Sequence, residues 1–125
     1  MAAILVADDD QTCRDSMCRV LEKEGYRVES APDVDSALES LRQRHFDLVV
    51  CDYRMPGRSG IDLLKELKRQ ESHVPVLMIS ASVDAGLEAM ALELGAVDML
   101  EKPVRRRNLV ERTALAMGGC WMRFA

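Results

Sequence analysis

The chain has 125 residues, which is enough for one domain of ordinary size and too few for two. Hydrophobic residues make up 48% of it, so it can bury a packed core and is not a disordered tail. Seventeen basic and 21 acidic side chains give a formal net charge of −4. This balance offers no general attraction to nucleic acid or to an anionic membrane, so we expect this domain itself to bind neither.

The four cysteines predict neither a zinc site nor a disulfide framework. No two of them form a Cys-x-x-Cys pair, and neither histidine stands at zinc-ligand spacing from them. The first apolar run, Ala2 to Ala7, stops at three aspartates, so it is neither a signal peptide nor a membrane span. We therefore expect a reduced, soluble protein in the cytoplasm.

Five short apolar or β-branched runs are expected to be strands. Continuous apolar runs of this length are typical of parallel strands that are covered on both faces of a sheet. The second run is the most polar and should lie at an edge. The expected strands are Ala3–Ala7, Tyr26–Ser30, Asp47–Cys51, Val74–Ser80 and Val97–Glu101.

Helical patterns separate these runs, and Gly25 and Gly95 are natural stops for two of them. The expected helices are Gln11–Glu24, Asp33–Arg44, Ile61–Gln70, Val83–Leu94 and Val104–Met117. This alternation predicts an α/β fold, a three-layer α/β/α sandwich with a five-stranded parallel sheet and right-handed crossovers. It places one domain at residues 1–117. Residues 118–125 depart from the pattern and are expected to be a tail or the start of a linker.

In an open α/β sheet, ligands bind at the carboxyl ends of the strands. Polar side chains stand at this end of four of the expected strands. They are Asp8, Asp9 and Asp10 after the first strand, Asp52 after the third, Ser80 after the fourth and Lys102 after the fifth. Clustered carboxylates repel one another unless a cation lies among them, and all-oxygen ligation suits Mg²⁺. Carboxylate, divalent metal, lysine and hydroxyl are the groups that transfer a phosphoryl group onto an aspartate. Asp10 is instead expected to cap the first helix.

Four motifs stand in order along nearly the whole chain. They are Ile4-Leu5-Val6-Ala7-Asp8-Asp9-Asp10, Leu48-Val49-Val50-Cys51-Asp52-Tyr53-Arg54-Met55-Pro56-Gly57 with Gly60 beyond, Val76-Leu77-Met78-Ile79-Ser80-Ala81, and Glu101-Lys102-Pro103. With these motifs the chain resembles a response-regulator receiver domain of two-component signalling, in the CheY-like superfamily, over about Ala3 to Met117. Each motif alone is weak, and their order and separations make the resemblance specific.

The resemblance implies a flavodoxin-like fold with strand order 2-1-3-4-5. It implies that a histidine kinase or a histidine phosphotransfer protein phosphorylates Asp52, and that the resulting switch controls an output domain or a partner. Mg²⁺ would be held by Asp8, Asp9, Asp52 and the backbone carbonyl of Arg54. Ser80 would supply the hydroxyl that follows the phosphoryl group, and Lys102 would be its salt-bridge partner.

Two residues depart from the family pattern. Met99 stands where Tyr or Phe is usual, and Val104 stands where an aromatic residue is common after the Lys-Pro pair. Because Met has many rotamers, we expect a graded repacking around Met99 in place of an aromatic two-state switch. A modest shift toward a homodimer is expected through the fourth helix, fifth strand and fifth helix. Lys102 is expected in a solvent-exposed ion pair worth ~0–1 kcal/mol, so its loss should affect the response more than folding.

Two alternative functions fit parts of the sequence. Asp8-Asp9-Asp10-Gln11-Thr12 also resembles the nucleophile motif of haloacid-dehalogenase-like phosphohydrolases, with Asp8 attacking and Asp10 as acid and base. Against it, no acidic pair follows a strand after Lys102, there is no room for a cap domain, and the motif around Asp52 is unexplained. The other alternative is a pseudo-receiver that docks partners without phosphorylation, which the intact site residues disfavour.

Overall fold

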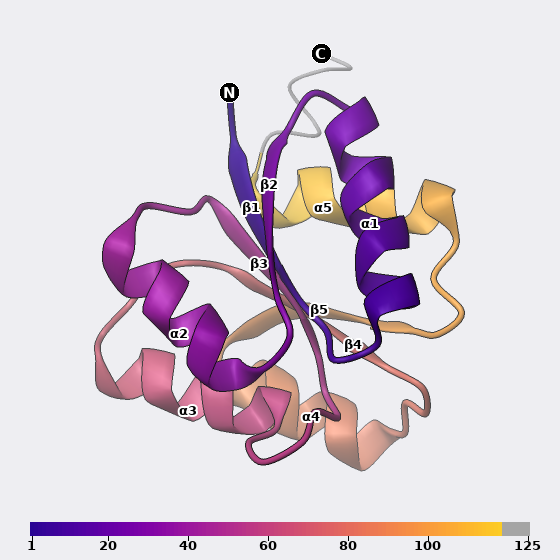
Figure 1. The fold of residues 1–125 in the computed structure, drawn as a ribbon. Helices are drawn as coiled ribbons and strands as arrows, with labels where there is room; N and C mark the ends of the chain where they lie inside the picture. Colours follow the sequence, from indigo (N-terminus) through magenta and orange to yellow (C-terminus); the bar gives the residue numbers. More distant parts are fainter. Residues whose placement is uncertain (119–125) are drawn as a thin grey trace.

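The computed structural model describes residues 1–118, which form a parallel sheet with helices on both faces (Figure 1). The strands are β1 (Ala3–Ala7), β2 (Arg27–Ala31), β3 (Leu48–Asp52), β4 (Val76–Ser80) and β5 (Ala96–Glu101). The helices are α1 (Gln11–Lys23), α2 (Val34–Gln43), α3 (Gly60–Arg69), α4 (Ala85–Glu93) and α5 (Arg106–Ala116). The strand order is β2-β1-β3-β4-β5, all neighbouring pairs are parallel, and the predicted flavodoxin-like α/β fold is confirmed.

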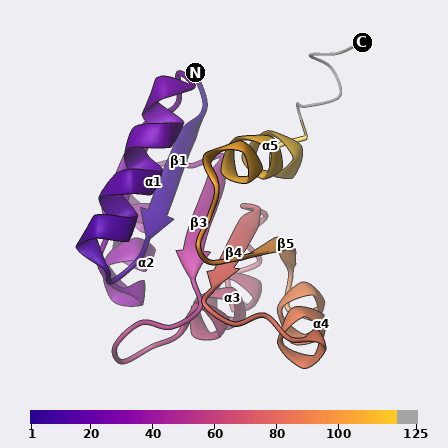
Figure 2. The ribbon, with the colours of Figure 1, turned by 90° about the vertical axis from the view of Figure 1, so that its right-hand side faces the viewer.

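Two apolar layers cover the sheet, one on each face. Buried residues of α1 and α5 pack on one face, and those of α2, α3 and α4 pack on the other. Figures 1 and 2 show the same division of the helices about the central strands. Every residue of β1, β3 and β4 is buried. That explains why their sequences are apolar without alternation, since side chains on both faces enter a core.

The more polar β2 lies at the edge of the sheet, as its composition predicted. Several element ends differ from the predicted ones by one or two residues. β4 begins at Val76, after Pro75, which has no N–H to donate to a neighbouring strand. β3 extends through Asp52, so this residue closes the strand instead of following it. The predicted tail lies almost wholly outside the described residues.

Among the described residues, side-chain caps begin four of the five helices. Asp10 accepts hydrogen bonds from the backbone N–H groups of Thr12 and Cys13 at the start of α1. Asp33 caps α2, Asp84 caps α4, and Ser59 forms a capping box in α3. These caps satisfy N–H groups that a helix leaves unpaired, and they fix where each loop beyond a strand turns into a helix. The loops at the carboxyl edge of the sheet are therefore anchored at their helix ends.

Among residues 1–118, we find no helix with the length and apolar character that crossing a bilayer requires.

Candidate functional site

Three carboxylates meet at the carboxyl edge of the sheet. β1 and β3 are neighbours with Ala7 opposite Cys51, so Asp8 and Asp52 come at the same height in adjacent strands. One carboxylate oxygen from each of Asp8, Asp9 and Asp52 lies within 4.8 Å of the others. Asp8 and Asp52 are buried, and Asp9 is exposed. The cluster predicted from the sequence is therefore formed, with its open side at Asp9.

The ammonium group of Lys102 lies between the two buried carboxylates. Its Nζ donates hydrogen bonds to Asp52 Oδ2 at 2.8 Å and to Asp8 Oδ2 at 3.2 Å. Lys102 itself is anchored next to β4, since its backbone N–H donates to the carbonyl of Ser80 at 2.8 Å, and its bond to Pro103 is cis. Burial alone lowers the pKa of Lys102, but the hydrogen bonds and charges of Asp52 and Asp8 outweigh burial and raise this pKa.

The expectation that this ion pair is solvent-exposed is wrong. The side chain of Lys102 is 22% exposed, and those of its partners Asp8 and Asp52 are 0% and 8% exposed. The reason is that Lys102 reaches back over β4 and β3 instead of extending outward from the end of β5. Removal of the ammonium group would leave two buried carboxylates facing each other.

We therefore expect Lys102→Ala to lower the free energy of unfolding by about 2 kcal/mol at pH 7, less than a fully buried pair would cost. Lys102→Met should lose nearly as much, because it keeps the aliphatic stem and lacks the charge. A raised lysine pKa means that the stabilisation is complete below the unfolded pKa of about 10.4 and is lost as the pH rises through the higher folded pKa. Urea unfolding from pH 7 to pH 11 measures the free energy of unfolding of the wild type and both variants. A Lys102→Met variant as stable as the wild type at pH 7 would contradict the prediction.

The environment of Asp52 opposes its ionisation. Burial raises the pKa of Asp52, and so does the charge of Asp8, while Lys102 and the backbone N–H of Arg54 lower it; the net shift is upward. The Arg54 N–H donates to Asp52 Oδ1 at 3.3 Å, which holds the loop after β3 against the carboxylate. A cation next to this cluster would relieve the repulsion between Asp8 and Asp52.

The donor set of the cluster fits Mg²⁺. It consists of carboxylate oxygens alone, with no sulfur or imidazole among the described groups, and Mg²⁺ prefers a few such oxygens completed by water. Asp9 is also on the open side, where it lines a hollow of about 480 Å³ with the loop from Tyr53 to Gly57. A hydrated ion and a phosphoryl group could both approach from this side. The backbone carbonyl of Arg54 as a fourth ligand stays a prediction.

Ser80 and Met99, the two predicted switch residues, occupy different surroundings. The buried hydroxyl of Ser80 donates to the carbonyl of Ser82 at 3.0 Å and accepts from its N–H at 3.3 Å. It is thus bonded within the loop before α4, beside an open groove of about 580 Å³ that reaches Tyr53. Met99 is buried in the apolar layer that also contains Ala91 of α4. Their roles in switching remain predictions.

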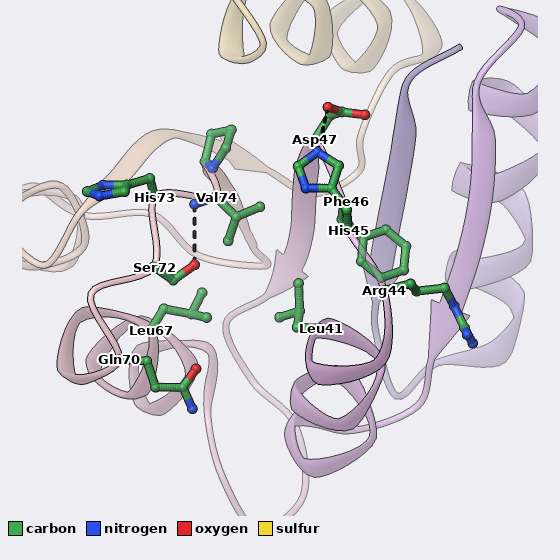
Figure 3. A pocket seen from close by; sticks show the side chains of 11 residues that line it. Leu41, Arg44, His45, Phe46, Asp47, Leu67, Gln70, Ser72, His73 and Val74 are labelled. Carbon is green, nitrogen blue, oxygen red and sulfur yellow. Dashed lines mark hydrogen bonds and ion pairs between the residues drawn. The ribbon is translucent and has the colours of Figure 1, made fainter.

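The two histidines lie away from the acidic cluster. Both line a hollow of about 390 Å³ at the opposite end of the sheet, where β3 and β4 begin (Figure 3). His45 Nε2 is 3.1 Å from Asp47 Oδ1, and Asp47 Oδ2 accepts the backbone N–H of Ala3 at 2.8 Å. This aspartate ties the start of β3 to that of β1. The hollow therefore lies at the amino ends of the strands and is separate from the acidic site.

Two polar side chains beside the site have a role in the structure that the sequence did not indicate. Arg14 of α1 donates from Nη1 to the backbone carbonyl of Asp8 at 2.7 Å. Glu101 of β5 accepts the backbone N–H of Val83 at 3.4 Å, in the loop that follows Ser80. Arg14 had one visible signal: a positive charge near the amino end of a helix is unfavourable and calls for a partner. Glu101 had none, because its partner is a backbone group of a distant loop.

Comparison with known proteins identifies the class of protein to which this fold belongs. The sequence model of the family described as "Response regulator receiver domain" matches residues 4–114. The chain therefore belongs to the response regulator receiver family, a family of signalling domains, as its motifs indicated.

Curated relatives and solved structures agree with this assignment. The chain is 44% identical over 100 residues to the transcriptional regulatory protein FixJ of Bradyrhizobium diazoefficiens, covering 80% of this chain and 49% of that protein. It is 37% identical to the phosphate regulon transcriptional regulatory protein PhoB of Escherichia coli, covering 91% of this chain and 51% of PhoB. The receiver domain of the Francisella response regulator 1452 has a TM-score of 0.90 at 30% identity, with 94% of this chain and 98% of that chain covered. The chain spans about half the length of the curated relatives it matches.

Proposed function

We propose that this receiver domain accepts a phosphoryl group on Asp52 from a histidine kinase or a histidine phosphotransfer protein, in a reaction that depends on Mg²⁺. One observation carries the proposal: Lys102 joins Asp52 to Asp8 in a cluster that Asp9 completes on the open side. The domain would comprise residues 1–117 in a cytoplasmic protein. It would act as a switch and not as an enzyme, beyond promoting its own phosphorylation and dephosphorylation.

The chemistry follows from the groups in the cluster. An oxygen of Asp52 attacks the phosphorus, its bond to phosphorus forms as the phosphorus–nitrogen bond of the donor breaks, and the donor imidazole leaves. Asp8, Asp9, Asp52 and the carbonyl of Arg54 would hold Mg²⁺, which when bound offsets negative charge on the phosphoryl oxygens. Lys102 supplies a second positive charge at Asp52. Ser80 would exchange its bonds to Ser82 for one to a phosphoryl oxygen.

Intact-protein mass spectrometry tests the proposal with a small phosphodonor. With acetyl phosphate and MgCl₂, one phosphate should be added to the chain; with EDTA in place of MgCl₂, labelling should be nearly abolished. A chain that stays unmodified with Mg²⁺, or that is labelled equally in EDTA, would reject the proposal. Addition of several phosphates would reject Asp52 as the sole acceptor.

The two alternative functions fit the geometry less well. As a phosphohydrolase acid and base, Asp10 would have to face the other carboxylates, but it caps α1 through Oδ1 and is not part of the cluster that Asp8, Asp9 and Asp52 form. The other required group, Asp8, is fully buried, and its two oxygens accept from Asp10 N–H and Lys102 Nζ. A pseudo-receiver would not need the bonds that join Lys102 to both carboxylates. We therefore place both alternatives behind phosphoacceptance.

We also propose how the domain passes on its signal: it controls an output domain or a partner, and it associates with a second copy. FixJ and PhoB are named as transcriptional regulators, so we propose that this receiver controls an output domain or a partner, without binding nucleic acid itself. Large apolar side chains are exposed on the three elements expected to associate: Met90 and Leu92 on α4, Val97 on β5 and Leu115 on α5. Burying them against a second copy would favour dimerisation.

We expect Met99→Tyr to sharpen dimerisation of the activated domain without altering phosphorylation of Asp52. Met99 is buried, and its flexible side chain can adopt many rotamers, whereas a tyrosine ring at this position would have a buried and an exposed orientation. Light scattering after gel filtration, with and without beryllofluoride and Mg²⁺, measures the association. A changed rate of phosphorylation with unchanged association would place Met99 in the phosphorylation site instead.

A further inference from the structure

We propose that Arg14 is a positioning residue for the Mg²⁺ site, acting through the backbone of the loop that carries Asp8 and Asp9. The inference rests on the proposed function, because it concerns the same metal site. Arg14 is in α1, and its guanidinium turns back toward the end of β1, where Nη1 donates to the carbonyl of Asp8 at 2.7 Å. It contacts the backbone of the loop, and within residues 1–118 it forms no ion pair with a carboxylate.

The carbonyl of Asp8 needs such a partner. The pairing of β1 with β2 and β3 ends at Ala7, so the strand ladder supplies no N–H for the carbonyl of the next residue. The remaining polar atoms of Asp8 are satisfied: its N–H donates to Ala31, Oδ1 accepts from Asp10 N–H, and Oδ2 accepts from Lys102. Arg14 supplies the last of these bonds and fixes the backbone as it leaves the strand.

Asp9 is the residue that depends most on this backbone bond. Its carboxylate is exposed, and no hydrogen bond or ion pair within residues 1–118 holds it, unlike Asp8 and Asp52. Its direction toward the cluster is therefore set by the backbone between Asp8 and Asp10. Asp10 is held by its cap on α1, and Asp8 is held by Arg14 from the same helix. The guanidinium thus orients a metal ligand without occupying any oxygen that the metal would need.

A positioning role and a simple charge effect predict opposite changes in Mg²⁺ affinity when Arg14 is removed. A cation near the cluster repels Mg²⁺, so if only its charge mattered, Arg14→Ala would tighten Mg²⁺ binding. If it positions the loop, Arg14→Ala should weaken binding by roughly tenfold, the usual cost of losing a group that orients a metal ligand. Arg14→Lys keeps a long donor that can reach the carbonyl, and it should recover most of the affinity.

Isothermal titration with MgCl₂ on the whole chain gives the readout, at a temperature below the melting transition of every variant. Arg19→Ala is the matched control, since Arg19 is exposed on the same helix and away from the Asp8 carbonyl. Weaker binding in Arg14→Ala, recovery in Arg14→Lys and wild-type affinity in Arg19→Ala would support the inference. Unchanged or tighter binding in Arg14→Ala would overturn it while the proposed function stands. A wild-type chain that binds no Mg²⁺ would overturn both.

Discussion

Asp52→Asn should lose all labelling by acetyl phosphate and yet unfold at a higher temperature than the wild type in EDTA. Loss of labelling follows because the amide has no nucleophilic carboxylate oxygen. The gain in stability follows because Asp52 shares a buried cluster with Asp8, and within residues 1–118 Lys102 is the one cation that forms an ion pair with either of them. Removing one charge balances the cluster, and we expect a gain of about 1 kcal/mol, or roughly 3–5 °C in melting temperature.

The pH dependence of this gain has a definite sign. Burial and the charge of Asp8 raise the pKa of Asp52 in the folded state above the unfolded value of about 3.9. The wild type therefore loses stability as the pH rises from about 3.9 through the folded pKa. Asparagine does not ionise, so the variant should exceed the wild type most at pH 7 and least near pH 4. MgCl₂ should narrow the difference at pH 7, because a ligand that binds the folded wild type stabilises it.

Asp15→Asn is the control for this experiment, since Asp15 is an exposed acidic residue on α1. It should be labelled like the wild type, and its melting temperature should change little. A stability gain in Asp15→Asn equal to that in Asp52→Asn would mean that net charge, and not the buried cluster, governs the effect. Labelling of Asp52→Asn at the wild-type rate would remove Asp52 as the acceptor.

The sequence was most informative in the buried strands, where continuous apolar residues fit one kind of structure. The buried runs around Val6 and Val50 are apolar at every position, which predicts parallel strands covered on both faces, and their ends carry the aspartates. Because parallel strands end at a common edge, the gathering of Asp8, Asp52 and Lys102 could be predicted without a structure. Element ends were less certain where turn geometry decides them, as at the start of β4.

Two kinds of detail could not be predicted: how deeply a long side chain is buried, and which backbone group a side chain contacts when it is not a helix cap. The depth of Lys102 depends on the path of its side chain over two strands, which the sequence does not encode locally, so its exposure was predicted wrongly. The bond from Arg14 to the carbonyl of Asp8 has no side-chain partner to reveal it. Gly60 belongs to a recognised motif, but the reason for glycine there appears only in three dimensions.

Gly60 is required by a close approach, and not by its backbone conformation. It is the first residue of α3, and its N–H donates to the carbonyl of Tyr53 at 2.8 Å, which draws the helix against the end of β3. A Cβ at this position would lie 2.7 Å from the backbone carbonyl oxygen of Asp52 and 2.6 Å from Met78 Sδ. The methionine side chain can move aside, but the carbonyl oxygen of Asp52 can move only with the strand.

Gly60→Ala should therefore lower the free energy of unfolding by about 1–3 kcal/mol, the usual cost of overpacking a core. It should also slow labelling of Asp52 by roughly tenfold or more, because a small displacement of a reacting group is costly. Gly86→Ala is the matched control: it is the same substitution in α4, where the Cβ would meet only Asp84 Oδ1 at 3.3 Å. There, alanine should leave labelling unchanged and raise stability by up to about 1 kcal/mol through its helix propensity. Urea unfolding and intact mass measure both effects, and a Gly60→Ala variant as stable and as readily labelled as Gly86→Ala would show that α3 can withdraw from β3 without disturbing Asp52.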